Sequence, residues 1–369
     1  MGDKINVLID DLQAFLLRIL GLPLSFQLLI WVCGVSLVWL IFLKLLGFTK
    51  LKDFSKSVKL VFYCTSVFLV VFAVLATAYD SKKYQMEQEL LRSKKKVILT
   101  TELNKDSTDA SYFSKYLENL KKLSFGTVTD LQYLQNDPGM EIMEINLEDP
   151  KIVAFIAAID LSKYNVVLDT GINKKELTSS FCKRFDADFA VNGEAGMSPG
   201  EKAPLGHWTG NYVVNGKPYL LTDTKSRPFL YFDKENNVYY SPDAEVVTNM
   251  NDKMYNVIWG RFDLILEGKI AIDPADATKK NPYPRTIVGI DKSGKYAFFM
   301  VVDGRRPEYS KGMTMQMCGE VMMAMGCYNA MACDQGGSSM MYSKKLDVVN
   351  RPADGRERVV YTHLGFRKK

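Results

Sequence analysis

Two long apolar runs dominate the pattern of hydrophobic and polar positions near the N-terminus. Residues 24–48 are almost wholly apolar, and residues 58–79 form a second run of the same character. A helix needs about 20 apolar residues to cross the hydrocarbon core of a bilayer, and both runs reach that length. The pattern therefore predicts a transmembrane helical hairpin over residues 24–79, which places the protein in a cell membrane.

The segments on either side of this hairpin are polar or mixed. Residues 1–23 contain an amphipathic stretch, which fits a helix at the membrane surface and a helix packed on the two spans equally well. The first apolar run is too long for a cleavable signal, and a second span follows it. Residues 80–96 are polar and rich in good helix formers, so we expect them to continue the second span as a stalk.

Basic residues give opposite indications of the orientation of the hairpin. The connecting loop is lysine-rich, which favours a cytoplasmic loop with both termini outside. Its lysines are Lys50, Lys52, Lys56 and Lys59. The basic residues that follow the second span favour the reverse orientation. They are Lys82, Lys83, Arg92 and Lys94 to Lys96.

After the hairpin, apolar positions recur at shorter intervals, and this pattern predicts one domain over residues 97–369. Short apolar runs bounded by turn residues indicate strands. We expect strands at 97–101, 152–161, 165–169, 231–233, 238–240 and on both sides of the turn Glu267-Gly268 within 256–272. Helical patterns cover 112–123 and 174–185. The predicted fold class is α+β, a mixed-sheet domain that follows two N-terminal transmembrane helices.

Residues 284–339 carry the most informative pattern in this domain. A strand over 295–302 ends at Asp303, a helix capped by Thr314 runs to about residue 325, and a strand over 329–333 ends at Asp334. Strand, helix and strand in this order most simply form a crossover with parallel strands. Both aspartates would then lie at the carboxyl ends of strands, at the edge where open sheets bind ligands.

Polar groups gather at these two strand ends. Glycines follow close behind both aspartates, so backbone N–H groups can approach a ligand there. Arg285 and Arg305 add forked donors that suit a phosphate. Together these groups predict a site for an anionic, phosphorylated ligand. The alternative is an ordinary surface, because Asp-Gly is a common turn and arginines are often solvated.

Composition narrows the classes of function. The chain has 369 residues, of which 47% are hydrophobic, and a formal net charge of +5 without a basic stripe that alternates with aromatic residues. These values are typical of a globular domain and do not predict nucleic-acid binding. The cysteines lack zinc-site spacing, and no cofactor is certain. A divalent cation could bind carboxylates and carbonyls near Asp334, and His207 could face either the site or the surface.

Five ordered motifs within about 75 residues resemble the phosphodiester glycosidase family. They are Pro284-Arg285-Thr286, Val301 to Arg305, Ser310 to Thr314, Asp334 to Ser339 and Val348 to Arg358. Weaker similarity reaches back to about residue 150 through 189–193 and 260–264, and residues 1–100 lie outside it. The resemblance implies a hydrolase that acts on a sugar phosphodiester, with its domain on the extracytoplasmic side of the membrane.

The resemblance and the strand-end pattern together suggest roles for individual residues. Asp303 and Asp334 are the expected catalytic carboxylates, one acting as acid and the other as nucleophile or base, in either order. The expected substrate-binding residues are Arg285, Arg305, Asn192, Gly193, Gly336, Gly337, Ser338, Ser339, Asn350 and Arg351.

Two positions depart from the family pattern. Gln335 replaces the first of three glycines that usually follow the aspartate, and Glu194 places a carboxylate where the family has a second glycine. The leading hypothesis is a membrane-anchored phosphodiester glycosidase that hydrolyses a sugar-1-phosphodiester or a related bond in an envelope glycan. The departures keep an alternative open, a non-catalytic glycan-binding or exopolysaccharide-assembly protein of the cell envelope. A scaffold that faces the cytoplasm is a third hypothesis.

Overall fold

The computed structural model describes residues 111–169, 175–194, 210–221, 227–242, 253–272 and 277–369. All of them belong to one compact unit, Leu91–Lys369. The predicted N-terminal segment, transmembrane hairpin and stalk, the strand at 97–101 and His207 lie outside the described residues. Within the described ranges, no helix has the length and apolar character needed to cross a bilayer.

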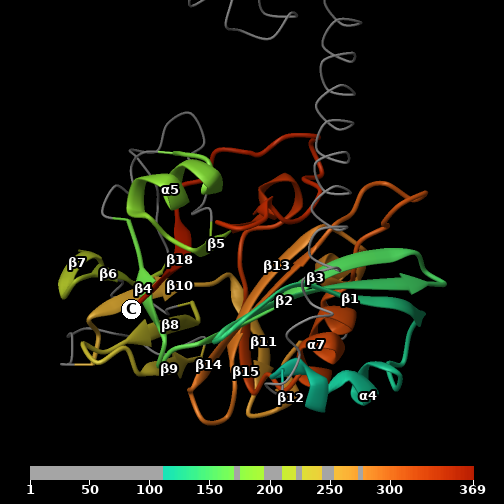
Figure 1. Cartoon of the computed structure of the whole chain (residues 1–369), viewed down its shortest axis with the longest axis horizontal. Coiled ribbons are helices and arrows are strands. Elements are labelled where there is room, and N and C mark those ends of the chain that lie inside the picture. The colour runs from blue at the N-terminus through green and yellow to red at the C-terminus, as the bar shows by residue number, and fades with distance from the viewer. Residues whose placement is uncertain (1–110, 170–174, 195–209, 222–226, 243–252, 273–276) are drawn as a thin grey trace, which may run out of the picture. The chain divides into compact units, whose positions relative to one another are not determined.

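An eight-stranded sheet runs through the domain in the order β1-β2-β3-β14-β13-β15-β11-β12 (Figure 1). Its strands are β1 (Thr127–Asp137), β2 (Met140–Glu148), β3 (Ile152–Asp160), β11 (Phe262–Leu266), β12 (Lys269–Ile270), β13 (Arg285–Ile290), β14 (Tyr296–Val302) and β15 (Asn329–Ala332). Every pairing between neighbours is antiparallel. Strand β3 is buried along its whole length, so this sheet must be covered on both faces.

Two five-stranded antiparallel sheets complete the strand structure, in the orders β7-β6-β10-β8-β9 and β17-β16-β5-β18-β4. The first contains β6 (Tyr212–Val214), β7 (Lys217–Leu220), β8 (Phe229–Phe232), β9 (Val238–Ser241) and β10 (Asn256–Trp259). The second contains β4 (Tyr164–Val167), β5 (Phe189–Asn192), β16 (Met341–Ser343), β17 (Asp347–Val348) and β18 (His363–Lys368). Strands outweigh helices in the described domain. The predicted α+β domain built on sheets is confirmed at this level.

Six short helices accompany these sheets in the described residues. They are η2 (Phe113–Lys115), α4 (Leu117–Leu120), α5 (Thr178–Phe185), α6 (Ala277–Lys280), α7 (Met315–Ala324) and η3 (Gly336–Ser338). Helix α7 follows β14 and lies against the large sheet (Figure 1). Its Thr314 cap is confirmed, since Thr314 Oγ1 accepts a hydrogen bond from Met317 N at 3.2 Å. Gly326, at φ +92°, follows the end of the helix as expected.

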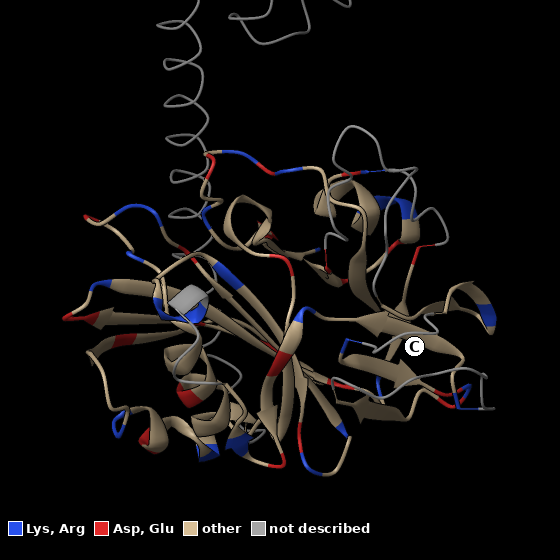
Figure 2. Ribbon diagram, turned by 180° about the vertical axis from the view of Figure 1, so that it is seen from behind, with Lys and Arg blue, Asp and Glu red and all other residues tan. Residues whose placement is uncertain are grey.

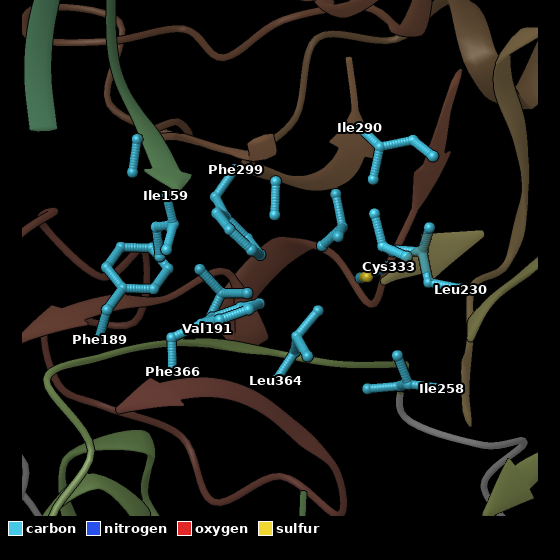
Figure 3. Close-up of a cluster of buried hydrophobic side chains, with 14 of the residues drawn as sticks. Ile159, Phe189, Val191, Leu230, Ile258, Ile290, Phe299, Cys333, Leu364 and Phe366 are labelled. Carbon is cyan, nitrogen blue, oxygen red and sulfur yellow. The ribbon is translucent and has the colours of Figure 1, made fainter. Parts of the chain in front are cut away.

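Two hydrophobic clusters hold the layers together. One lies where the large sheet meets the two smaller sheets, and it includes Phe299, Phe189, Leu230 and Phe366 (Figure 3). The other packs α7 and α4 on strands of the large sheet, through side chains such as Val321 and Phe298. Charged side chains lie mainly in loops and at strand ends, while the strands are largely uncharged (Figure 2).

The predicted crossover with parallel strands is confirmed, and the structure adds a strand between the two. Strands β14 and β15 are joined by α7 and run parallel in one sheet, but β13 lies between them and pairs antiparallel with both. The reason is local, because β13 and β14 form a tight hairpin in which Gly294 takes φ +70°. Strand β15 can then reach the sheet only on the free side of β13. Asp303 and Asp334 still follow strands that end at the same edge.

Other predicted elements are confirmed with shifted boundaries. The strand at 152–161 is β3, and the pair at 231–240 is the hairpin of β8 and β9. Glu267 and Gly268 form the turn between β11 and β12, with φ of +49° and +73°. The helix expected over 174–185 begins only at Thr178, and the one expected over 112–123 is divided into η2 and α4.

A buried histidine makes the stability of this domain dependent on pH. His363 of β18 is 1% exposed and stacks on Phe181 of α5, with ring centroids 4.8 Å apart. Burial lowers the pKa of its imidazole to about 3. The negative charge of Asp169 opposes this lowering, and the positive charge of Arg184 adds to it. The unfolded chain takes up this proton near pH 6.5. The contribution of His363 to stability is therefore full above about pH 6.5 and is lost progressively as the pH falls toward 3.

Replacement of His363 by leucine, which keeps an apolar group of similar size, should weaken this pH dependence. Between pH 6 and pH 4 the free energy of unfolding of the wild type should fall faster than that of the variant, by about 1.4 kcal/mol per pH unit. Urea titrations at several pH values measure both curves. Parallel curves for wild type and His363→Leu would show that the histidine is protonated without cost in the folded state.

Candidate active site

The loop after β15 is clamped between two sheets. Asp334 N donates to Gly193 O at 3.2 Å, and Gly336 N donates to Pro284 O at 3.0 Å. Gly193 follows β5 in one sheet, and Pro284 precedes β13 in the other. Gly336 takes φ +70°, a conformation that favours glycine. The predicted glycine-rich loop therefore has a defined position at the junction of the two sheets.

Asn192 joins the segments that meet at this loop. Its Nδ2 donates to Asp334 O at 2.9 Å, while its Oδ1 accepts from Thr286 Oγ1 at 2.7 Å and from Met340 N at 3.0 Å. The side chain is fully buried. Asn192 was predicted to bind substrate, and its geometry assigns it to holding the loop in place.

Asp303 is also held in place by buried hydrogen bonds. It is 2% exposed, and its carboxylate oxygens accept from Tyr309 Oη at 2.9 Å, Asn350 Nδ2 at 3.0 Å and Arg351 N at 3.0 Å. Asn350 also donates to Ser339 O at 3.2 Å. The predicted residues Asp303, Asn350 and Arg351 are thus brought together, in a buried network that orders the end of the glycine-rich loop.

Asp334 has a more open position than Asp303. Its side chain is 17% exposed, and its Oδ1 lies 3.9 Å from Arg261 Nη1 and accepts from Gln335 N at 2.9 Å. Arg261 is 47% exposed and was not predicted as a site residue. It belongs to the short connection between β10 and β11, and only its place in the segment 260–264 could have indicated it. Asp334 is therefore a partly exposed carboxylate beside a guanidinium, and it is more accessible than Asp303.

Glu194 follows Gly193, whose backbone O accepts the hydrogen bond from Asp334 N. Burial raises the pKa of the Cys333 thiol, and the negative charges of Glu194 and Asp334 raise it further. Glu194 is 3% exposed, and its backbone O accepts from Thr362 Oγ1 at 2.6 Å. A second acidic side chain therefore borders the site, on the side of β5.

Arg285 is buried beneath the loop rather than presented at its surface. It is 3% exposed, and its guanidinium donates to Met313 O at 3.0 Å, to Asn281 O at 2.6 Å and to Gln335 Oε1. Burial lowers the pKa of this guanidinium. Gln335, the residue that departs from the family pattern, thus occupies one of the donors predicted for a phosphate.

Arg305 is the accessible one of the two predicted arginines. Its side chain is 45% exposed, and its Nη1 lies 3.6 Å from Asp354 Oδ1. A Cβ placed on Gly336 would lie 2.9 Å from Arg305 Nη2, so the guanidinium lies directly against the loop. Gly337 is likewise covered by Asp354 and Arg358. The rim of the site therefore carries three half-exposed guanidinium groups, those of Arg261, Arg305 and Arg358.

The other residues that were predicted to bind substrate are enclosed by these segments. Gly193 is pressed against Thr362, and Ser338 and Ser339 are buried at 3% and 1% exposure. Within the described ranges, no cluster of three or more His, Cys, Asp or Glu side chains is arranged to hold a metal ion. The arrangement can bind an anion at its rim, and two partly exposed carboxylates, Asp334 and Asp354, lie beside its guanidinium groups.

Sequence comparison identifies the family to which this arrangement belongs. Residues 170–367, more than half of the chain, match the phosphodiester glycosidase family. The chain belongs to the phosphodiester glycosidase family. No curated protein sequence matches it. The recognition from the five motifs is thereby confirmed, and the family's members are hydrolases that act on sugar phosphodiesters.

Solved structures of other proteins are similar to this domain. One is the catalytic domain of zebrafish N-acetylglucosamine-1-phosphodiester alpha-N-acetylglucosaminidase, auto-inhibited by its pro-peptide, with a TM-score of 0.52 and 19% identity over 66% of this chain and 89% of that one. Another is a hypothetical protein from Synechocystis, with a TM-score of 0.45 and 10% identity over 64% of each chain. At such identities the likeness to the zebrafish domain shows the fold alone.

The backbone conformation of Arg305 allows a test of whether this residue contributes to the stability of the domain. Its φ of +63° is left-handed, which costs a non-glycine residue about 1 kcal/mol or more. Its half-exposed ion pair with Asp354 contributes little to stability, so it does not offset this cost. We expect Arg305→Gly to keep or raise the melting temperature, and Arg305→Ala to fall below Arg305→Gly by about 1 kcal/mol. Calorimetric melts of both variants decide this, and a lower melting temperature for Arg305→Gly than for Arg305→Ala would contradict it.

Proposed function

We propose that this protein is a membrane-anchored phosphodiester glycosidase that hydrolyses a sugar-1-phosphodiester, or a related bond, in an envelope glycan outside the cytoplasm. The observation that carries the reaction is the position of Asp334. It is a partly exposed carboxylate on a clamped glycine-rich loop, with Arg261 Nη1 3.9 Å from its Oδ1 and with the guanidinium of Arg305 against Gly336 of the same loop. Carboxylate and guanidinium are the groups that a sugar phosphodiester requires at C1 and at phosphate.

The reaction that these groups support is cleavage of the bond between C1 of the sugar and the bridging oxygen. The bridging oxygen leaves with the electron pair as part of a phosphomonoester, and the oxygen of a water molecule becomes the anomeric hydroxyl. The guanidinium of Arg305 stabilises the departing phosphate. Asp334 faces C1, where it stabilises positive charge or activates the water. Asp303 acts indirectly by ordering residues 339–351.

The buried hydrogen bond from Arg285 to Gln335 supports a second candidate, an envelope protein that binds such glycans without cleaving them. One assay separates the two functions. The full-length protein in detergent is incubated with sugar-1-phosphodiesters, including an N-acetylglucosamine-1-phosphodiester as in the name of the zebrafish relative. Release of reducing sugar and phosphomonoester in equal amounts supports the enzyme. Binding of the diesters without release would support the second candidate.

The membrane topology is tested separately. The lysine-rich loop at 49–59 and the extracytoplasmic placement implied by the family support a domain outside the cytoplasm. A reporter that is active only outside the cytoplasm is fused after Lys369. A silent reporter on a well-expressed fusion would assign the domain to the cytoplasmic side.

A further inference from the structure

Gln335 contacts the buried guanidinium of Arg285 from the loop that carries Asp334. Its Oε1 accepts a hydrogen bond from Arg285 Nη1. Gln335 is partly exposed, whereas Arg285 is only 3% exposed. The family pattern usually has a glycine at this position, which has no side chain. In this chain, an amide therefore occupies a charged donor that a glycine would leave open.

The surroundings of Arg285 supply no anion to balance its charge. Its hydrogen bonds go to Met313 O at 3.0 Å, to Asn281 O at 2.6 Å and to Gln335 Oε1, which are all uncharged oxygens. Burial lowers the pKa of the guanidinium, and the positive charge of Arg261 adds to this lowering. A buried guanidinium is best stabilised by a negative partner. At the loop, a neutral amide oxygen takes the position of such a partner.

Arg305 lies against the next residue of the same loop. A Cβ on Gly336 would lie 2.9 Å from Arg305 Nη2. The guanidinium groups of Arg305 and Arg285 lie 5.6 and 5.4 Å from the ring centroid of Tyr283, so one ring adjoins both. Arg305 is half-exposed and can meet an anion directly, whereas the acceptor position at Arg285 Nη1 is taken. The side chain of Gln335 therefore decides how many guanidinium groups an anion at the loop can contact.

The amide of Gln335 also has a defined orientation. Arg285 Nη1 is a donor, so the oxygen of the amide must face it and Nε2 must point elsewhere. This Nε2 is buried and has no hydrogen-bond partner in the part of the chain that the structure describes. Such a donor costs free energy until an acceptor occupies it. Gln335 thus replaces a charged donor by an uncharged one that an oxygen of a ligand can satisfy.

The number of charged donors affects phosphate esters differently according to their charge. A phosphodiester carries one negative charge, and a phosphomonoester carries nearly two above about pH 7. Coulomb energy is proportional to charge. The loss of one guanidinium contact therefore weakens the binding of a dianion about twice as much, in free energy, as the binding of a monoanion. In the proposed reaction the diester is the substrate and the monoester is a product.

We propose that Gln335, by occupying Arg285, makes the anion site selective for phosphodiesters over phosphomonoesters. The proposal rests on the proposed function only for the statement that the diester is the substrate. The binding preference itself requires no hydrolysis. For the enzyme, its consequence is weak inhibition by the phosphomonoester product.

The test is Gln335→Ala in the full-length protein in detergent. Gln335 has extended backbone, with φ −126° and ψ −178°, which alanine adopts without strain. The hydrogen bonds from Asp334 N and Gly336 N that clamp the loop are made by backbone groups and remain. The ligands are methyl phosphate and dimethyl phosphate at about pH 7.5, which differ by one methyl group and one charge. Removal of the amide should lower the dissociation constant about tenfold for methyl phosphate and about threefold for dimethyl phosphate.

Two further variants complete the design. Gln335→Glu keeps the contact with Arg285 and adds a negative charge, so the dissociation constants should rise, about tenfold for methyl phosphate and about threefold for dimethyl phosphate. Gln316→Ala is the control of equal size change, because Gln316 is an exposed residue of α7 that contacts Glu320. It should leave both constants within about twofold of the wild type.

Ligand-observed NMR titrations measure these constants whether or not any diester is cleaved. Equal changes for the two ligands in Gln335→Ala, or no tighter binding of methyl phosphate, would overturn the proposal. Cleavage of sugar-1-phosphodiesters is assayed on the same samples. A charge preference that follows Gln335 without any cleavage would support the proposal and refute only the proposed hydrolysis.

Discussion

Replacement of Asp334 by asparagine is expected to lower the turnover of a sugar-1-phosphodiester by about a thousandfold or more. Asparagine cannot act as a nucleophile or base, and it carries no charge to stabilise an oxocarbenium ion. It can still accept the hydrogen bond from Gln335 N, and its side chain has almost the same volume. The fold should therefore be unaffected, with a melting temperature within about 2 °C of the wild type. Initial rates of reducing-sugar release on the full-length protein measure the effect.

Asp186→Asn is the matched control for this prediction. Asp186 pairs with Lys344 at the surface and precedes β5, whereas the site lies after the other end of that strand. Its φ of +50° is tolerated by asparagine, so the control removes one carboxylate without backbone cost. The control should keep wild-type turnover. Near wild-type turnover by Asp334→Asn would make Asp334 a turn residue and direct the search for the reactive carboxylate to Glu194.

Replacement of Asp303 by alanine is expected to lower the free energy of unfolding by about 3–5 kcal/mol. The change leaves Tyr309 Oη, Asn350 Nδ2 and Arg351 N without their common buried acceptor. For a domain of this size the melting temperature should fall by about 10 °C. Asp303→Asn keeps part of the network and should lose less. Denaturant titrations of both variants beside the wild type measure the difference.

The activity of the Asp303 variants separates an indirect role from a direct one. If Asp303 only orders the loop, the residual turnover of Asp303→Asn should follow the fraction of folded, ordered protein and improve at lower temperature. A variant that melts like the wild type but has lost turnover would return Asp303 to the reacting groups, which is the role expected from the sequence. The two carboxylates are thus distinguished by measurements on stability and rate together.

Local patterns predicted the elements around the site well. Strand β14, helix α7 with its Thr314 cap, and strand β15 all occur within a residue or two of their expected positions. Each depends on neighbours in sequence, through apolar periodicity, a capping hydroxyl or a glycine stop. The position of β13 between β14 and β15 could not be predicted in this way, because strand order depends on which edges remain free when the sheet assembles.

The chemistry of the site could likewise be predicted only in part from neighbouring residues. Residue types indicated an anion site with two aspartates and two arginines, and the motifs indicated the family, which the comparison confirms. Sequence could not distinguish Asp334 from Asp303, or Arg305 from Arg285, because the difference within each pair is burial. Burial is decided by segments far away in the chain, such as Asn350 against Asp303 and Gln335 against Arg285.

By itself, the sequence determined the family, the apolar runs at the N-terminus, the local elements from β14 to β15 and the residue types available for chemistry. These properties are encoded in neighbouring residues and in ordered motifs, so they can be derived without knowing which segments meet. The tertiary structure alone decided the order of strands, the clamping role of Asn192, and the presence of Arg261 at the rim. These properties depend on contacts between residues separated by tens to hundreds of positions, and only the packing of the sheets around one loop brings those residues together.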